Sequence, residues 1–317
     1  MELSNISIKK LIGGACYFEE RGGYLYSYHY TKAQLDYFAT LGYWGDNARM
    51  LLGGRIEMIT DATELSFKYF KHEERTDHCT FDLYINGVAH TIHDTEKVGG
   101  SVAKFSLPKG EKHVCIYFPV YGEVGIKALT LNGKYKAYKK KRTKLLAIGD
   151  SITQGYGAVW AGATYINVLS RLCGYDTLNQ AIGGYRFDAD GVCEIEGYAP
   201  DKVLVALGTN FYNDKSYDYE AEVSGFFEKL NRLFGGKKTL VITPVWRNDN
   251  TDRQRFDWCC EVIRRECAKY SYITVVRGLD LIPPIDECYL TDKVHPNAYG
   301  ALHMAENLNR IVKKVKF

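Results

Sequence analysis

The sequence lacks any long apolar run, and this limits where the protein can reside. No uninterrupted apolar stretch approaches the ~20 residues of a membrane span. The N-terminal segment MELSNISIKKLIGGACYFEE has no apolar core of the roughly 7–15 residues that a secretory signal needs. The nine cysteines are scattered and odd in number, which is typical of reduced thiols rather than of a disulfide framework. We therefore expect a soluble cytoplasmic protein.

Charge of one sign and several common binding motifs are also missing. A net charge of +3 is too small to predict nucleic acid or a membrane as a partner. No Gly-x-Gly-x-x-Gly follows the first buried strand, and neither a P-loop nor the Gly-x-Ser-x-Gly of α/β-hydrolases occurs. The candidate metal ligands lack the spacing of zinc motifs; they are His72, His78, Cys79, His90 and His93. We expect no metal and no cofactor.

The composition is that of a folded protein with more than one domain. Of 317 residues, 46% are hydrophobic and 25% charged, enough to bury sizeable cores. Aromatic residues reach 14%, mostly from 25 tyrosines. Tyrosine suits stacking against sugar rings but is equally ordinary in β-strands, so composition alone leaves both interpretations open.

Short β-type runs separated by turn residues occupy residues 1–142. Turn pairs such as Asn86-Gly87 and Asn132-Gly133 lie between them. Repeated strands without helical patterns predict an all-β sandwich or jelly-roll domain. The expected strands are 55–60, 64–70, 80–86, 101–107, 112–120 and 124–132.

A basic run at 134–144, which is typical of a solvated linker, precedes a different pattern over residues 143–317. Here buried strands alternate with amphipathic helices, as in βαβ units with a parallel sheet. We expect a compact three-layer α/β/α domain of about five parallel strands. These are 144–149, 177–182, 202–208, 238–243 and 272–276.

Four segments that can carry chemistry lie at strand ends or before the last helix. GDSITQG follows the first strand, with Ser151 where the chain turns towards a helix. TDKVHPN places Asp292 three residues before His295, within reach across one tight turn. NQAIGG and GTN end the second and third strands, and they offer a glycine N–H and the Asn210 amide as donors to an oxyanion. Each segment alone is equally typical of a turn or a helix cap.

Together, the four ordered blocks resemble the SGNH/GDSL hydrolase family, whose catalytic domain is a flavodoxin-like α/β/α fold. The resemblance covers residues 143–317 and implies Ser151 as nucleophile, His295 as general base and Asp292 as its orienter. It implies an oxyanion hole made by the Ser151 N–H, the Gly184 N–H and the Asn210 side chain.

Two positions depart from the family pattern. Phe211 stands where many members have Asp, and Gly183 precedes Gly184, which leaves open which glycine supplies the N–H. The first half is similar, less specifically, to the β-sandwich that precedes this domain in some bacterial SGNH esterases. Asp150 and Trp246, with the neighbouring Arg247, are candidate pocket residues.

The Tyr-rich segment 22–30 and the pair Tyr43-Trp44 either contact substrate or fill strands and interfaces.

We expect a serine esterase that cleaves a short acyl group, with acetyl first, from a carbohydrate or related small polar molecule such as an acylated sugar. The alternatives are a thioesterase or lysophospholipase, and a non-catalytic carbohydrate-binding protein. The sequence predicts no oligomeric state.

Overall fold

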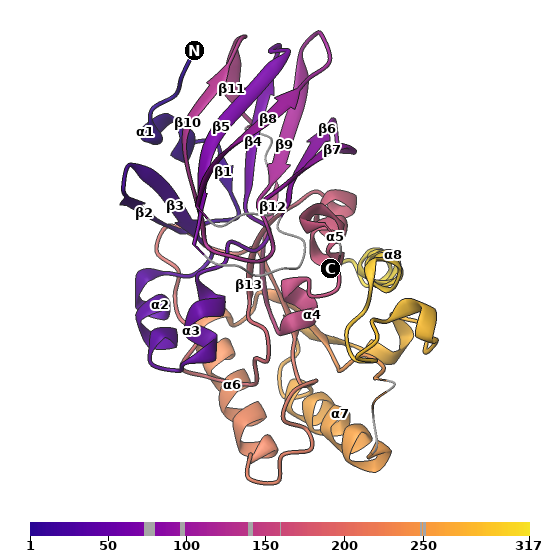
Figure 1. Cartoon of the computed structure of the whole chain (residues 1–317). Coiled ribbons are helices and arrows are strands. Elements are labelled where there is room, and N and C mark those ends of the chain that lie inside the picture. Colours follow the sequence, from indigo (N-terminus) through magenta and orange to yellow (C-terminus); the bar gives the residue numbers. More distant parts are fainter. Residues whose placement is uncertain (73–79, 96–98, 139–141, 159, 248, 250–251) are drawn as a thin grey trace. The chain divides into compact units, whose positions relative to one another are not determined.

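The computed structural model describes residues 1–72, 80–95, 99–138, 142–158, 160–247, 249 and 252–317 (Figure 1). By their contacts these residues form two compact units. The first comprises Met1–Thr31, Arg49–Arg142 and Trp160–Gly162, and the second comprises Lys32–Ala48, Thr143–Val159 and Ala163–Phe317.

The first unit consists of two antiparallel sheets. One has the order β1-β4-β9-β6-β7, with β11 beside β4, and the other has the order β2-β3-β10-β5-β8. A short helix, α1 (Asn5–Lys9), precedes them. The strands are β1 (Ile12–Gly13), β2 (Tyr17–Arg21), β3 (Tyr24–Tyr28), β4 (Arg55–Thr60), β5 (Glu64–Lys71), β6 (Thr80–Ile85), β7 (Val88–Asp94), β8 (Gly99–Ser106), β9 (Lys112–Tyr117), β10 (Val124–Leu131) and β11 (Tyr135–Ala137).

Alternating side chains from the two sheets form one core, which confirms the predicted sandwich. Phe67 of β5 packs edge-on against Phe81 of β6, with ring centroids 4.9 Å apart. The Tyr-rich segment forms β3, which pairs with β2 through a tight turn at Gly22 and Gly23. Both glycines have positive φ, as this two-residue hairpin turn requires.

The second unit contains the predicted five-stranded parallel sheet, in the order β13-β12-β14-β15-β16. Because the chain goes from β12 first to one neighbour and then to the other, the carboxyl end of β12 is the topological switch point where such sheets bind ligands. The strands are β12 (Thr143–Gly149), β13 (Tyr175–Ala181), β14 (Lys202–Ala206), β15 (Lys238–Ile242) and β16 (Ile273–Val276).

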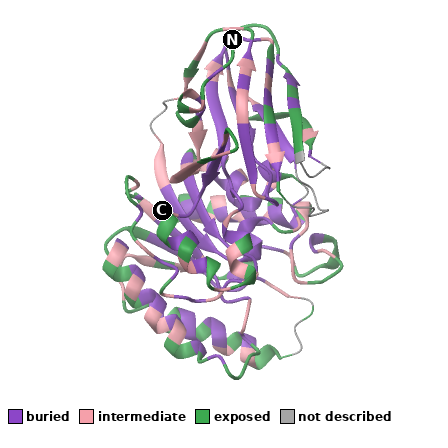
Figure 2. Ribbon diagram, turned by 60° about the vertical axis from the view of Figure 1, so that its left-hand side comes forward, coloured by how far each residue is buried: buried purple, intermediate pink, exposed green. Residues whose placement is uncertain are grey.

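Helices cover both faces of this sheet, which makes the expected three layers. Helices α5 and α8 pack on one face with the side chains of Leu145, Leu204 and Leu240, while α6 packs with α7. Figure 2 shows burial concentrated on the strands and on one side of the helices. The helices are α2 (Lys32–Ala39), α3 (Tyr43–Ala48), α4 (Ser151–Gln154), α5 (Tyr165–Cys173), α6 (Tyr219–Phe234), α7 (Arg253–Cys267) and α8 (Ala298–Lys314).

In the described part of the chain, no helix is both long and apolar enough to cross a bilayer.

Helices α2 and α3 differ from the sequence-based division at residue 142, which assigns them to the first domain. Their contacts place Lys32–Ala48 in the second unit. Phe38 is fully buried and packs edge-on against Tyr185, and the Gln34 amide exchanges hydrogen bonds with the Gln180 amide at 3.2 and 3.0 Å. These partners lie about 150 residues away in the chain, so local sequence patterns do not reveal that Lys32–Ala48 belongs to the second unit.

Candidate active site

Ser151 lies directly after the switch-point strand β12, as the first residue of α4. The preceding Asp150 is the N-cap, and Gly155 ends this short helix in a left-handed conformation. The Ser151 Oγ lies 2.8 Å from Nε2 of His295, although 144 residues separate the two in the chain. The first N–H groups of a helix have no partner within it, so the Ser151 N–H is also available at this position.

Asp292 holds His295 through a closed local turn. One carboxylate oxygen accepts the N–H groups of Val294 and His295 at 2.9 and 3.0 Å, and the other contacts His295 Nδ1 at 2.6 Å. Lys293 has a φ of +60°, which bends the chain enough for this geometry. Burial opposes the charge, but the hydrogen bonds from His295 lower the pKa of Asp292 below its ordinary value.

The hydrogen-bond partners determine the imidazole tautomer. An ionised carboxylate only accepts, so His295 Nδ1 carries the proton that it donates to Asp292. Nε2 of the neutral ring is then an acceptor for the Ser151 hydroxyl. The three side chains form a continuous hydroxyl–imidazole–carboxylate chain, which is the arrangement that activates a serine nucleophile.

Tyr156 covers the imidazole and is a residue that sequence reasoning missed. Its ring lies 4.3 Å from the His295 ring, at an interplanar angle of 53°. Gly157 follows with a φ of +89°, and a Cβ at this position would lie 2.3 Å from the carbonyl oxygen of Pro296. The only sequence signal was a tyrosine between two glycines, Gly155 and Gly157, directly after the GDSIT block.

The two predicted oxyanion loops are joined by a hydrogen bond. Asn210 Nδ2 donates to the Tyr185 carbonyl at 3.0 Å, which leaves its second amide proton for another acceptor. Ile182 and Tyr185 close a turn through a 3.1 Å hydrogen bond, with Gly184 in the left-handed region at φ +72°. Within the described residues, neither the Gly183 nor the Gly184 N–H has a hydrogen-bond partner.

Helix α3 places Tyr43 and Trp44 beside these loops. A Cβ on Gly184 would lie 3.7 Å from Trp44 Nε1 and 3.7 Å from the Tyr43 ring. The Trp44 indole packs edge-on against Tyr185 at 5.3 Å and against Phe211 at 6.5 Å. Of the two aromatic segments singled out in the sequence, this pair therefore lies next to the glycine turn.

Asp150 and Trp246, the candidate pocket residues, have structural contacts of their own. Asp150 is buried, and its carboxylate accepts the Ile152 N–H at 3.0 Å, which makes it a helix cap. Burial raises the pKa of Asp150 to about 7, against the opposing effects of the Ile152 N–H and the Arg247 charge. Trp246 packs against the α5/α8 core, and the Arg253 guanidinium lies 5.0 Å from its ring.

The described residues hold no cluster of three or more potential metal ligands. Of the histidines considered in the sequence, His72 Nε2 lies 2.7 Å from the Tyr26 hydroxyl, and His90 and His93 lie on β7. His78 and Cys79 fall outside the described residues.

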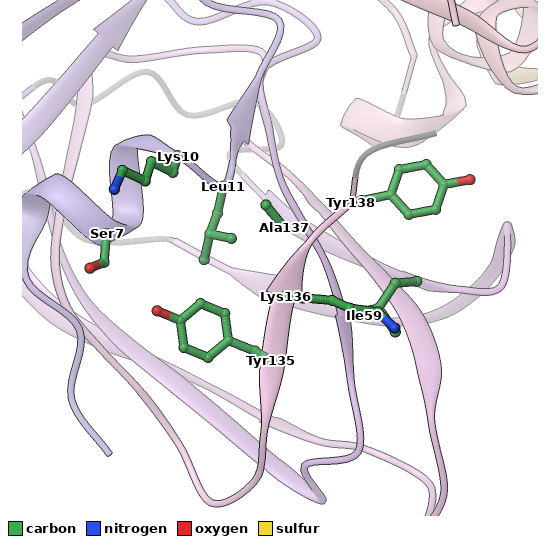
Figure 3. A pocket seen from close by; sticks show the side chains of 8 residues that line it. All are labelled: Ser7, Lys10, Leu11, Ile59, Tyr135, Lys136, Ala137 and Tyr138. Carbon is green, nitrogen blue, oxygen red and sulfur yellow. The ribbon is translucent and has the colours of Figure 1, made fainter. Parts of the chain in front are cut away.

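A cavity of about 900 Å³ lies in the first unit (Figure 3). Its described lining residues include two lysines and two tyrosines but no acid and no histidine, so these residues offer no hydrolytic chain. The lining residues are Ser7, Lys10, Leu11, Ile59, Tyr135, Lys136, Ala137 and Tyr138.

A parallel α/β/α sheet with a serine–histidine–aspartate chain at its switch point is an arrangement typical of serine hydrolases. The model of the GDSL-like lipase/acylhydrolase family matches residues 147–302. The second unit therefore carries a GDSL-like acylhydrolase domain, and the protein is an SGNH-type carboxylic ester hydrolase.

Solved structures share the fold at low sequence identity. A salicylyl-acyltransferase from a tetracycline biosynthetic pathway is 18% identical, with 96% of this chain and 94% of that chain covered and a TM-score of 0.82. A Bacteroides ovatus protein named as a GDSL-like lipase is 18% identical, with 96% and 95% covered and a TM-score of 0.77. A family two carbohydrate esterase from Clostridium thermocellum, in complex with cellohexaose, is 18% identical, with 84% and 93% covered and a TM-score of 0.67.

None of the curated proteins compared with the chain matches it.

Proposed function

We propose that the protein is a serine esterase whose nucleophile is Ser151, with His295 as general base and Asp292 as its orienter. The observation that carries the proposal is the chain of contacts of 2.8 and 2.6 Å through the two nitrogens of His295. Ser151 Oγ and His295 Nε2 lie within the hydrogen-bond distance that proton transfer requires.

The reaction proceeds in two acyl-transfer steps. His295 Nε2 takes the hydroxyl proton as Ser151 Oγ attacks the ester carbonyl, and the tetrahedral oxyanion forms. The oxyanion accepts hydrogen bonds from the N–H groups of Ser151 and Gly184 and from the second amide proton of Asn210. When the intermediate collapses, the alcohol leaves with the proton from His295, and an acyl-enzyme remains on Ser151. Water repeats the sequence, so ester and water give acid and alcohol.

The substrate class that we propose is a short acyl ester, with acetyl first, of a carbohydrate or a related small polar molecule. The similarity in fold to a carbohydrate esterase solved with cellohexaose supports a sugar as the alcohol. The aromatic side chains of Tyr43 and Trp44 beside the glycine turn offer flat apolar surfaces of the kind that pack against sugar rings. The cytoplasmic location inferred from the sequence stays a prediction.

The test is hydrolysis of p-nitrophenyl acetate, butyrate and octanoate by wild type and Ser151→Ala. We expect turnover that falls with chain length and that Ser151→Ala lowers to the level left by binding and the oxyanion hole alone. Mass spectrometry after acid quench should show one acetyl group on the peptide that contains Ser151.

Other outcomes separate the alternatives. Faster turnover of octanoate, thioesters or lysolipids than of acetate would overturn the short-acyl substrate but keep the mechanism. A Ser151→Ala variant with wild-type rates would overturn the mechanism. Glycan binding that is unchanged by Ser151→Ala, with no ester hydrolysed, would instead indicate a non-catalytic carbohydrate-binding protein.

A further inference from the structure

Arg186 lies two residues after Gly184 and is enclosed by aromatic rings. The centre of its guanidinium lies 5.5 Å from the Trp44 ring, 5.4 Å from the Phe211 ring and 5.1 Å from the Tyr217 ring. These distances are within the range of cation–π attraction. Phe211 directly follows Asn210, and Arg186 follows Gly184 by two residues. The arginine and the rings around it are therefore next to both proposed oxyanion loops.

No described carboxylate makes a close ion pair with Arg186, although the arginine charge helps to lower the pKa of Asp214. Among the residues that the structure describes, Arg186 has no ion pair within 4 Å, and its Nε is buried without a hydrogen-bond partner. Asp188, two residues away, receives the Tyr37 hydroxyl at 3.0 Å and the Asp190 N–H at 3.0 Å. Asp214 receives the amide and hydroxyl of Ser216 instead.

Three arginines whose side chains are 17% exposed or less each contact a carboxylate. Arg55 and Arg142 both contact Glu57, and Arg247 contacts Asp249. Arg186 is partly buried, so its guanidinium has lost part of its hydration without gaining a carboxylate, and a ligand that supplies a carboxylate would restore the missing partner. The planar guanidinium matches a carboxylate, which it can bind through two parallel N–H donors.

We propose that Arg186 is a substrate-binding residue that selects esters bearing a carboxylate, such as acetylated sugar acids. The inference rests on the proposed function, because the ester carbonyl must lie at Ser151 while the carboxylate reaches Arg186. The adjoining rings of Trp44 and Phe211 exclude water from the ion pair and so strengthen it.

The test compares two substrates that differ only in this charge: monoacetylated methyl glucuronoside and monoacetylated methyl glucoside. For wild type we expect kcat/KM for the acid to exceed that for the neutral sugar by about 10–100-fold, as for a charge-assisted bidentate contact. Arg186→Gln should bring this ratio close to one. Arg186→Lys keeps the charge but not the planar donor pair, and should give an intermediate ratio.

Lys202→Gln is the matched control. Lys202 is also a cation over two aromatic rings, 5.2 Å from Tyr175 and 4.9 Å from Phe317. It begins β14, so it lies at the amino ends of the parallel strands, whereas Ser151 follows their carboxyl ends. Its removal should leave the ratio at the wild-type value. If the loss of any one positive charge lowered the ratio of the two kcat/KM values, Lys202→Gln and Arg186→Gln would lower it alike.

The outcomes keep this inference apart from the proposed function. Ser151-dependent turnover of the neutral ester with a ratio unaffected by Arg186→Gln overturns the role of Arg186 alone. If neither ester is hydrolysed, calorimetric binding of methyl glucuronoside to Ser151→Ala and to Ser151→Ala/Arg186→Gln decides the question. Weaker binding to the double variant by about 10-fold or more supports the inference, and equal binding overturns it. If Arg186→Gln does not fold, an Arg186→Lys ratio equal to that of wild type in low and high salt overturns the inference.

Discussion

Asn210 is the residue on which the proposed oxyanion hole can be tested most directly. Its amide holds the Tyr185 carbonyl with one proton, and the other proton is free to stabilise charge that exists only in the transition state. Asn210→Ala should lower kcat about 10²–10³-fold with little change in KM. Steady-state kinetics on p-nitrophenyl acetate measures this. A loss of less than about 3-fold in a variant that melts like wild type would exclude Asn210 from the oxyanion hole.

Asp150 should make stability depend on pH. Its pKa is raised by burial to about 7 in the folded protein, against about 3.9 in an unfolded chain. Between these values the folded state binds more protons than the unfolded state, so the free energy of unfolding falls as pH rises from 4 to 7. Asp150→Asn keeps an oxygen for the Ile152 N–H and should remove this slope.

Urea unfolding at pH 5 and pH 8 tests the role of Asp150. The free energy of unfolding of Asp150→Asn relative to wild type should rise with pH, by about 4 kcal/mol at most across the whole range. If the difference between the two proteins is the same at both pH values, the carboxylate does not titrate as described.

At the scale of elements, the loop after α4 is held against the loop that carries His295. In Gly157→Ala the new Cβ would lie 2.3 Å from the Pro296 carbonyl oxygen, in a left-handed conformation that alanine disfavours. The loops must then separate, which should lengthen the contact between Ser151 and His295 and lower kcat at least 10-fold.

Gly197→Ala provides the matched control for this loop. Gly197 also has a positive φ, +73°, but a Cβ there meets nothing within 4 Å. It should therefore cost only the backbone strain, about 1 kcal/mol, with kcat unchanged. Thermal melts and kcat measured on both variants separate the backbone strain that they share from the collision with Pro296 that only Gly157→Ala introduces. Equal effects on kcat would show that the loop contact does not position the site.

At the scale of the whole molecule, the catalytic unit includes residues from the first half of the chain, Lys32–Ala48. A fragment that begins at Thr143 lacks α2 and α3, which leaves the Gln180 amide without Gln34 and Tyr185 without Phe38. Loss of one hydrogen-bond partner of a buried amide costs about 1–3 kcal/mol, and loss of a buried phenylalanine costs about 3–5 kcal/mol. We therefore expect this fragment to lose cooperative unfolding and esterase activity.

Circular dichroism melts of the fragment and of the full chain measure the loss of stability. Phe38→Ala in the full chain should also lower the melting temperature, and it tests the same contact without a deletion. A fragment that melts as cooperatively as the full chain and keeps its activity would show that Lys32–Ala48 is dispensable.

The sequence by itself determined the class of fold and the places where chemistry can occur. Strands can be recognised from short-range alternation and from buried apolar runs. The antiparallel sandwich and the parallel sheet that follows it in the chain were therefore predictable. Asp292 and His295 lie three residues apart, so their contact is local and could also be expected from the sequence. Ser151 could be predicted as the nucleophile only from the four ordered blocks together, because a serine at the turn from a strand to a helix is by itself also typical of a helix cap.

Only the tertiary structure decided which distant segments surround these residues. The place of Lys32–Ala48 in the second unit, the contact of Tyr156 with His295 and the aromatic rings around Arg186 all depend on contacts across the fold. Trp44 and Arg186 are 142 positions apart, and no local pattern encodes that separation. Such contacts arise because several elements bury their apolar faces together, and the free energy of that packing belongs to the assembled fold rather than to any one segment.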